Sequence, residues 1–342
     1  MQIRKQVAKL GIEHFVDAEP GISHQMMVDR GYARPGELVV GNDSHTVGYG
    51  ALNVGSTGIT RADMLYTLLF GELWFQVPGS IKLVLNGKQP NYPIAKDIIL
   101  HLAGLYGDDF AQNSSIEFTG SLVPQLSMDS RMCLSTHGVE VAAKFAMFPF
   151  DEVTDEYLKD KTDHPYEPIA ADADAVYDRE IVLNVDEMPF AVAKPHHFGN
   201  VFPVSDSAGI KVDQAQIGSC ANGRLEDIEI AARMMKGRKV AKGVRFVISP
   251  ASQMIYLQCI KAGYIETLLE AGVQFVTPGC GICQPKVGYM AEGEVCITAT
   301  TRNFKGRKGS QKADIYLAGP LTVTAAAVAG RIIDPREVFD EI

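Results

Sequence analysis

The amino-acid sequence predicts an α/β protein with doubly wound parallel sheets. Along most of its 342 residues, apolar runs typical of strands alternate with segments of helical periodicity. Two glycine-containing turns that carry cysteines each follow such an apolar run. In α/β sheets these strand-to-helix turns gather at the carboxyl edge, where ligands bind. We therefore expect a ligand site at that edge.

The composition narrows the class of protein. Charged residues make up 21% and hydrophobic residues 46%, a balance typical of soluble proteins, and the net charge of −9 argues against a nucleic-acid partner. The longest weakly polar run, residues 317–330, is too short and too interrupted to span a membrane. No secretory signal is visible, and six cysteines in a chain this long do not form a secreted disulfide framework. A reducing compartment, the cytoplasm, is therefore expected.

Three α/β domains are expected, covering residues 1–79, 80–190 and 191–342. In the first, residues 5–10 favour a helix, residues 36–40 a turn and a strand, and a capping box from Thr60 to Asp63 begins another helix. Four glycines between positions 48 and 58 form no nucleotide-binding motif, so we interpret them as places where the backbone approaches a cofactor or substrate. The single tryptophan, Trp74, is interpreted as a packing residue.

The other two domains continue the alternation. In the second, residues 81–85 alternate like a half-buried strand, Asn86-Gly87 marks a turn, and residues 151–186 form an acidic surface excursion. Its other expected elements are helices over 95–105 and from Ser127, and strands over 116–120 and 181–183. In the third domain we expect strands over 244–248, 273–277, 296–299 and 313–318, and helices over 265–271, 286–291 and 322–330.

A pair of cysteines lies in the turn from Pro278 to Cys283, in which glycines flank Cys280. Thiolates on a strand-to-helix turn face the positive end of the helix dipole, which favours the charged form that binds metals. On its own, this C-x-x-C motif leaves zinc, disulfide redox chemistry and an iron–sulfur cluster equally open.

A third cysteine, Cys220, lies in a similar turn that follows a strand-like run and precedes a helical segment. Three thiolates without an obvious fourth ligand suit a cluster with one open iron, whereas a structural zinc ion would need a fourth Cys or His. The remaining cysteines lack glycine-flanked turns and are interpreted as small buried residues: Cys133, Cys259 and Cys296.

Four motifs follow one another in a recognisable order. They are Gly41-Asn42-Asp43-Ser44-His45-Thr46, Gly218-Ser219-Cys220-Ala221-Asn222, Gly279-Cys280-Gly281-Ile282-Cys283 and Thr300-Thr301-Arg302-Asn303-Phe304-Lys305-Gly306-Arg307. These resemble the G-x-D-S-H-T, G-S-C-T-N, G-C-G-P-C and S-N-R-N-F-x-G-R motifs of the aconitase superfamily of [4Fe–4S] hydro-lyases. The closest resemblance is to large subunits of the two-subunit members, 3-isopropylmalate dehydratase and homoaconitase.

The resemblance implies a three-domain fold around a central cluster site and assigns roles to the motif residues. It implies that three irons of a [4Fe–4S] cluster are held by Cys220, Cys280 and Cys283, with Asn222 and Asn303 beside them. It implies catalytic pairs between His24 and Asp43 and between His45 and Glu140, with Ser44 adjacent. It implies that Arg302 and Arg307 clamp substrate carboxylates. The implied reaction is dehydration and rehydration of a small hydroxy di- or tricarboxylic acid, most simply that of 3-isopropylmalate dehydratase in leucine biosynthesis.

Judged without the resemblance, several of these residues have ordinary interpretations. Asp43 and Ser44 would be a helix cap or turn, and Glu140 a solvated helix residue. His137 would be a surface or packing residue. The basic side chains of the 302–308 segment would be surface charge.

The resemblance also implies a partner and shows departures. Two-subunit members carry a swivelling domain, with a catalytic serine and further arginines, on a separate small subunit, so we expect this chain alone to be inactive. The family's N-terminal Asp–His pair is not found before His24, and Thr136 and Thr301 stand where the family usually has asparagine. The alternatives are homoaconitase, aconitase or dimethylmalate dehydratase-like activity, a truncated non-catalytic member, and a zinc or C-x-x-C redox protein.

Overall fold

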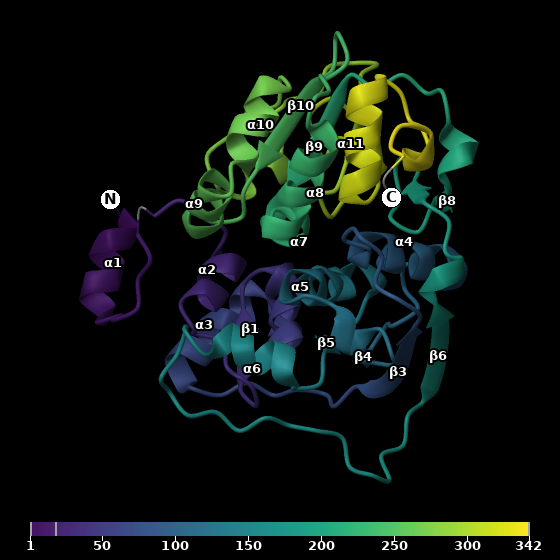
Figure 1. The fold of residues 1–342 in the computed structure, drawn as a ribbon. Helices are drawn as coiled ribbons and strands as arrows, with labels where there is room; N and C mark the ends of the chain where they lie inside the picture. Colours follow the sequence, from purple (N-terminus) through teal and green to yellow (C-terminus); the bar gives the residue numbers. More distant parts are fainter. Residues whose placement is uncertain (1, 18, 341–342) are drawn as a thin grey trace.

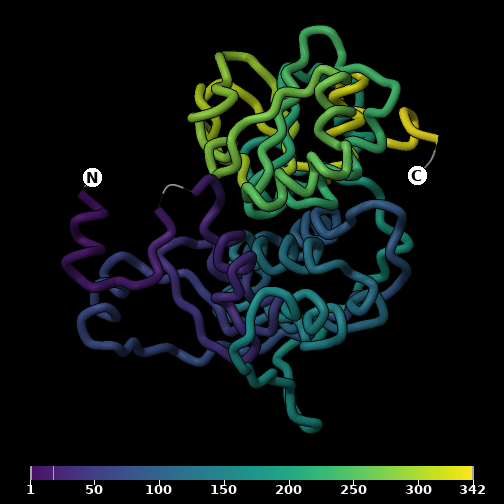
Figure 2. Tube along the Cα trace, turned by 60° about the vertical axis from the view of Figure 1, so that its left-hand side comes forward, coloured from purple at the N-terminus to yellow at the C-terminus, as the bar shows by residue number. Residues whose placement is uncertain are grey.

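The computed structural model describes residues 2–17 and 19–340, which form two bodies stacked one above the other (Figure 1). The lower body contains a two-stranded and a four-stranded sheet, and the upper body a seven-stranded sheet. In the rotated view, the purple-to-teal part of the chain builds the lower body and the green-to-yellow part builds the upper one (Figure 2). The structure is therefore an α/β protein with mainly parallel sheets, as the sequence predicts.

The four-stranded sheet has the order β5-β4-β3-β6, and all neighbouring strands are parallel. Its strands are β3 (Gly79–Asn86), β4 (Ser114–Thr119), β5 (Phe145–Met147) and β6 (Arg179–Asn184). In β3, Ile81, Leu83 and Leu85 are buried while the residues between them are not, so the predicted half-buried strand is confirmed. The helices α4 (Ala95–Tyr106) and α5 (Met128–Thr136) contribute buried side chains to the same core.

The first part of the chain contributes α1 (Gln2–Leu10), α2 (Ser23–Asp29), the parallel pair β1 (Leu38–Gly41) and β2 (Gly55–Gly58), the 3₁₀ helix η1 (Ser44–Leu52) and α3 (Arg61–Phe70). The capping box is confirmed: Thr60 and Asp63 cap α3 reciprocally. No residue of α3 is buried, and the Trp74 that follows it is 83% exposed. The interpretation of Trp74 as a packing residue is therefore wrong, because the residue type alone does not say whether other parts of the chain cover the side chain.

The seven-stranded sheet has the order β11-β10-β9-β12-β13-β7-β8. Its strands are β7 (Ala191–Ala193), β8 (Val201–Pro203), β9 (Gln214–Gly218), β10 (Arg245–Ser249), β11 (Gln274–Phe275), β12 (Val295–Thr298) and β13 (Asp314–Leu317). Strands β9 to β13 are parallel, and β7 and β8 pair antiparallel at one edge. The upper helices are α7 (Ser219–Asn222), α8 (Leu225–Met235), α9 (Gln253–Lys261), α10 (Tyr264–Glu270) and α11 (Pro320–Ala329).

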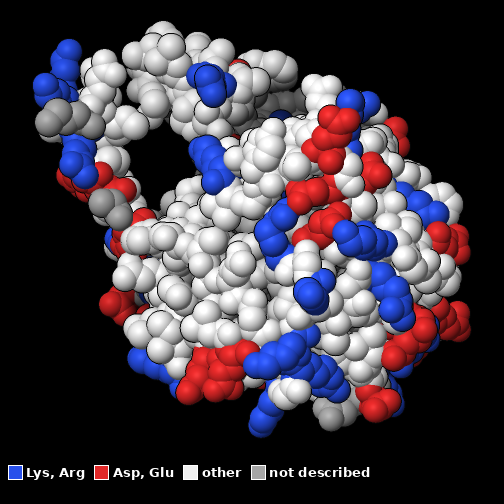
Figure 3. Space-filling model, turned by 90° about the horizontal axis from the view of Figure 1, so that it is seen from above, with Lys and Arg blue, Asp and Glu red and all other residues white. Residues whose placement is uncertain are grey.

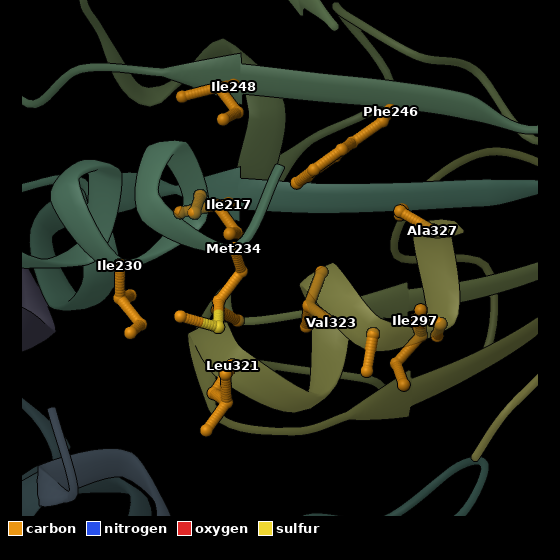
Figure 4. Close-up of a cluster of buried hydrophobic side chains, with 14 of the residues drawn as sticks. Ile217, Ile230, Met234, Phe246, Ile248, Ile297, Leu321, Val323 and Ala327 are labelled. Atoms are coloured by element: carbon orange, nitrogen blue, oxygen red, sulfur yellow. The ribbon is translucent and has the colours of Figure 1, made fainter. Parts of the chain in front are cut away.

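The upper core forms where α8 and α11 pack on the sheet. Figure 4 shows Met234 of α8 and Val323 of α11 lying toward Ile217 and Phe246 of the central strands, and all four are buried. Burying a side chain of this size stabilises the fold by about 1.5–3 kcal/mol. This core fixes the orientation of the strands whose carboxyl ends carry the cysteine turns.

Three predicted elements differ from the structure. The run 273–277 was expected to be a buried strand, but β11 has two residues, with Gln274 exposed, because it lies at the sheet edge. Residues 286–291 contain no helix, and the cysteine turn instead forms the 3₁₀ helix η6 (Cys280–Cys283). The acidic excursion contains a short helix, α6 (Glu152–Leu158), which is capped by Asp151.

Two observations concern the helices and the surface charge of the described residues. Within residues 2–17 and 19–340, no helix is long and apolar enough to cross a membrane. In the view from above, Lys and Arg are interspersed with Asp and Glu (Figure 3).

Candidate functional site

The cysteine turns follow two strands of the upper sheet that have one strand between them. Cys220 lies in α7, directly after β9, and Cys280 and Cys283 lie in η6, after β11, with β10 between the two strands. Since these strands are parallel, both turns emerge at the same carboxyl edge. Helix α7 forms the underside of the upper body and faces α5 below it (Figure 1). The three cysteines therefore lie at one edge of the sheet, and α7 places Cys220 at the junction of the two bodies.

The backbone of the Cys220 turn is tightly constrained. A Cβ atom on Gly218 would lie 2.8 Å from the carbonyl oxygen of Ser249, so only glycine fits there. Ser219 has a φ of 85°, a left-handed conformation that is rare for a residue with a side chain. Strain of this kind persists only where the surrounding structure imposes it, and it places Cys220 at the sheet edge.

The three thiols differ in exposure and charge. Cys220 and Cys283 are buried, whereas Cys280 is exposed. A hydrogen bond from Cys280, helped by the positive charge of Lys308, lowers the pKa of Cys283 to about 6, and the same pairing raises the pKa of Cys280. Among the described residues, the three sulfurs do not all lie within 4.8 Å of one another. One zinc ion with Zn–S bonds of about 2.3 Å could not reach all three as they stand. The all-thiolate donor set is the kind that holds an iron–sulfur cluster.

Two histidine–carboxylate pairs lie beside the cysteines. His24 of α2 contacts Asp43 through Nε2 at 3.0 Å, and the Tyr49 hydroxyl lies 3.1 Å from its Nδ1. His45 of η1 contacts Glu140 through Nε2 at 3.0 Å. Asp43 caps η1 by accepting from the backbone N–H of His45 at 2.9 Å, so one carboxylate joins both histidines. The structure thus brings together both pairs that the resemblance implies.

The charges of these groups depend on one another. The hydrogen bond from His24, followed by that from His45, holds the pKa of Asp43 well below its usual range. Burial lowers the pKa of His45, but the charge of Cys220 and the neighbouring carboxylates outweigh burial and raise it well above its usual value. Burial raises the pKa of Glu140, yet contacts with His45 and Arg302 outweigh it and lower that pKa. The arrangement therefore favours a protonated His45 between ionised carboxylates.

Arg302 links this network to the loop after β12. Its Nε donates to Glu140 Oε1 at 2.7 Å, and its Nη2 donates to the Ser44 hydroxyl at 3.0 Å. Arg307, in the same loop, has its guanidinium 5.1 Å from the centre of the Phe304 ring. Glu140, which could pass for a solvated helix residue, is instead nine-tenths buried in this network. Arg302 is partly exposed, so its guanidinium can also reach a small anion.

The two asparagines that the resemblance places beside the cofactor, Asn222 and Asn303, form hydrogen bonds with other protein groups. Asn222 donates to Asp227 at 2.9 Å and accepts from Cys133 Sγ at 3.6 Å. Asn303 donates to the backbone carbonyls of Lys194 at 2.9 Å and His197 at 3.3 Å. In the structure both amides brace the loops that carry the site.

The glycine-rich segment lies close to neighbouring parts of the chain. A Cβ atom on Gly50 would lie 1.9 Å from the carbonyl oxygen of Ala146, and one on Gly58 would lie 2.8 Å from that of Asp43. Gly48 abuts the side chain of the buried Thr136. These three glycines allow chain segments to pack closely around η1, and the approach of this segment to a cofactor or substrate stays a prediction.

No sequence pattern marks three buried polar residues that form side-chain contacts: Lys308, His137 and Lys96. Lys308 is buried, and its Nζ donates to the Ile282 carbonyl at 2.8 Å and to the side-chain oxygen of Gln216, so it is not surface charge. His137 is fully buried and contacts Lys96, which is also fully buried. Only contacts with segments remote in the sequence distinguish these residues from ordinary lysines and histidines. The interpretation of Cys133, Cys259 and Cys296 as small buried residues is confirmed.

Comparison with known proteins places this geometry in context. The sequence pattern described as the aconitase family (aconitate hydratase) matches residues 1–210 and 205–330. The chain is 42% identical to 3-isopropylmalate dehydratase large subunit 1 of Methanopyrus kandleri over 98% of this chain and 80% of that protein. It is 43% identical to the probable methanogen homoaconitase large subunit of Methanosarcina mazei, over 98% and 86% of the two chains. A solved aconitase X of Thermococcus kodakaraensis aligns at 12% identity with a TM-score of 0.49, over 91% and 70% of the chains.

Proposed function

Since this chain belongs to the aconitase family, we propose that it is the cluster-bearing large subunit of a two-subunit hydro-lyase. One observation supports this most directly: Cys220, Cys280 and Cys283 share the sheet edge at which two histidine–carboxylate pairs and Arg302 converge. The proposed substrate is a small hydroxy di- or tricarboxylic acid, first of all 3-isopropylmalate. The proposed domains are residues 1–79, 80–190 and 191–342, each of which contains one of the three sheets.

The proposed chemistry divides between cofactor and protein. A [4Fe–4S] cluster held by Cys220, Cys280 and Cys283 would supply a Lewis-acid iron for the substrate hydroxyl and carboxylate. Arg302 and Arg307 would bind the carboxylates of the substrate and fix its orientation. His45, which contacts Glu140 and lies beside Asp43, would hold the proton that leaves with the hydroxyl group as water. His24, oriented by Asp43 and Tyr49, would order the same edge of the site.

The relatives' names, which include the words large subunit, support a small-subunit partner. We propose that this partner completes the site and that the large subunit alone does not turn over substrate. Purified chain should therefore gain activity only when mixed with a small subunit of one of these relatives. Turnover of a hydroxy acid without any partner would contradict this part of the proposal.

Anaerobic reconstitution with iron and sulfide tests the cluster. Wild-type chain should take up about four irons and absorb broadly in the visible range. Cys220→Ser should lose the cluster, whereas the control Cys259→Ser, at a buried cysteine away from the turns, should retain it. Stoichiometric zinc, or a dithiol activity that needs Cys280 and Cys283 but not Cys220, would instead indicate a zinc or redox protein.

A further inference from the structure

Helix α4 begins with two adjacent buried charges. Lys96 is completely buried and Asp97 is 4% exposed. Their helix lies at the top of the lower body, against the upper one (Figure 1). Removing a charge from water costs several kcal/mol unless hydrogen bonds compensate, and an apolar side chain of similar size is often no less stable. A lysine at this position therefore calls for a reason other than stability.

The Lys96 amine joins two segments that are remote in sequence. Its Nζ lies 2.8 Å from His137 Nε2 and donates to the Thr300 carbonyl oxygen at 3.2 Å. His137 Nδ1 lies 2.8 Å from the Cys133 carbonyl oxygen, so Nδ1 carries the proton and Nε2 accepts from the amine. Phe198 packs against both groups. The centre of its ring is 5.2 Å from the Lys96 amine and 5.9 Å from the centre of the His137 ring.

Both contacts stand next to the site. His137 begins η3 (His137–Val141), which carries Glu140, and Thr300 lies two positions before Arg302. Glu140 and Arg302 form an ion pair, with 2.7 Å between Oε1 and Nε, and this pair orients His45. The neighbouring Asp97 lies against the N-terminus of α11, where its Oδ2 leaves no room for a Cβ atom on Gly319. The first turn of α4 thus holds the loops that follow β12 and β13.

We propose that Lys96 is a positioning residue that holds the Arg302 loop against the Glu140 turn. It contacts neither the cysteines nor the substrate-facing side chains, and it acts through the backbone of Thr300 and the imidazole of His137. Without the amine, each loop keeps its own strand but loses the shared anchor that sets the spacing between Arg302 and Glu140. Only the expected kinetic effect of this role depends on the proposed function of the chain.

The test compares Lys96→Met, which keeps the volume but removes the donor, with the control Lys82→Met at the exposed Lys82–Glu180 pair. In chain without cluster, hydrogen exchange of residues 136–141 and 299–303 should accelerate about tenfold in Lys96→Met and remain unchanged in the control. With cluster and small subunit, KM should rise and kcat/KM should fall by roughly 10- to 100-fold, since small misplacements cost that much. Unchanged exchange in both segments would overturn the proposal.

A second variant guards against a general loss of structure. His137→Phe keeps a ring beside Phe198 but removes the acceptor of the Lys96 amine. If the two residues act through one contact, the double variant should exchange no faster than the worse single variant. Additive effects would overturn the shared-anchor interpretation. If wild-type chain binds no iron, the proposed function fails, while the exchange experiment still decides the role of Lys96.

Discussion

His45 Nε2 and Glu140 Oε1 lie 3.0 Å apart, and the same carboxylate oxygen accepts from Arg302 at 2.7 Å. One buried oxygen therefore holds a histidine of the lower body and an arginine of the upper body. The pairing keeps Glu140 ionised, as its lowered pKa indicates. His45 also lies close to Cys220, whose charge raises the pKa of the imidazole. The orientation of the imidazole thus depends on the docking of the two bodies.

Glu140→Gln should reduce kcat by about 10²- to 10⁴-fold in the reconstituted two-subunit enzyme, because the amide cannot stabilise a protonated imidazole. Iron content should change little, since the amide oxygen still accepts from both neighbours. The matched control is Glu156→Gln at an exposed pair with Lys159. Full activity of Glu140→Gln would remove this carboxylate from the mechanism.

Arg302→Lys should raise KM for a dicarboxylic substrate more than it lowers kcat. Lysine keeps the charge but loses the planar fork that binds Glu140, Ser44 and a carboxylate together. We expect kcat/KM to fall at least tenfold, an effect of about 1.4 kcal/mol. Arg336→Lys, at an exposed pair with Asp334, provides the control, and equal kinetics in the two variants would argue against a clamp.

Local patterns and site geometry were predictable to different degrees. Alternation predicted β3, and the Thr60–Asp63 box predicted the start of α3, because both signals lie within one element. The pairing of His45 with Glu140 was predicted only through the family resemblance. No pattern in the neighbouring sequence marks Lys96, because one of its partners, the Thr300 carbonyl, is 204 positions away. Trp74 shows the converse, an apolar residue that the described chain leaves exposed.

Asp151→Asn should destabilise the lower body by about 3 kcal/mol near neutral pH, because it leaves the buried Arg131 unpaired. Arg131 donates to the two carboxylate oxygens of Asp151 at 2.7 and 2.5 Å. Burial raises the pKa of Asp151, but Arg131 outweighs burial and lowers it. The stabilisation is therefore complete above the ordinary pKa of about 4 and is lost as the pH falls through the lower, folded value.

Urea unfolding at pH 7, 5 and 3 measures this difference. The gap between wild type and Asp151→Asn should be largest at pH 7 and should shrink at pH 3. Glu156→Gln again serves as the exposed control. A gap that does not depend on pH would show that the ion pair contributes no charge-dependent stability.

Glu226→Gln should stabilise the junction of the bodies at alkaline pH. Burial, followed by the charges of Asp129 and Asp227, raises the pKa of Glu226 to about 8. The folded protein therefore binds a proton that the unfolded chain releases above about 4.3, so stability declines as the pH rises from there toward 8. A neutral amide keeps its contacts with the Ser127 and Ser130 hydroxyls and avoids this loss.

Melting temperatures at pH 5, 7 and 8.5 provide the measurement. The gain of Glu226→Gln over wild type should grow with pH, whereas Glu229→Gln, at an exposed position of the same helix, should show no such trend. An equal gain at every pH would mean that packing rather than charge causes it.

The contacts of the site span long stretches of sequence. Arg302 and Ser44 are 258 positions apart, and His45 and Glu140 are 95 apart. Closing such loops costs entropy that local segments cannot recover on their own, so contacts of this kind form slowly during folding. Each sheet can assemble from its own segment, whereas the site requires both bodies to have folded and docked. The site is thus the last part of the native structure to assemble and the first to be lost when the bodies separate.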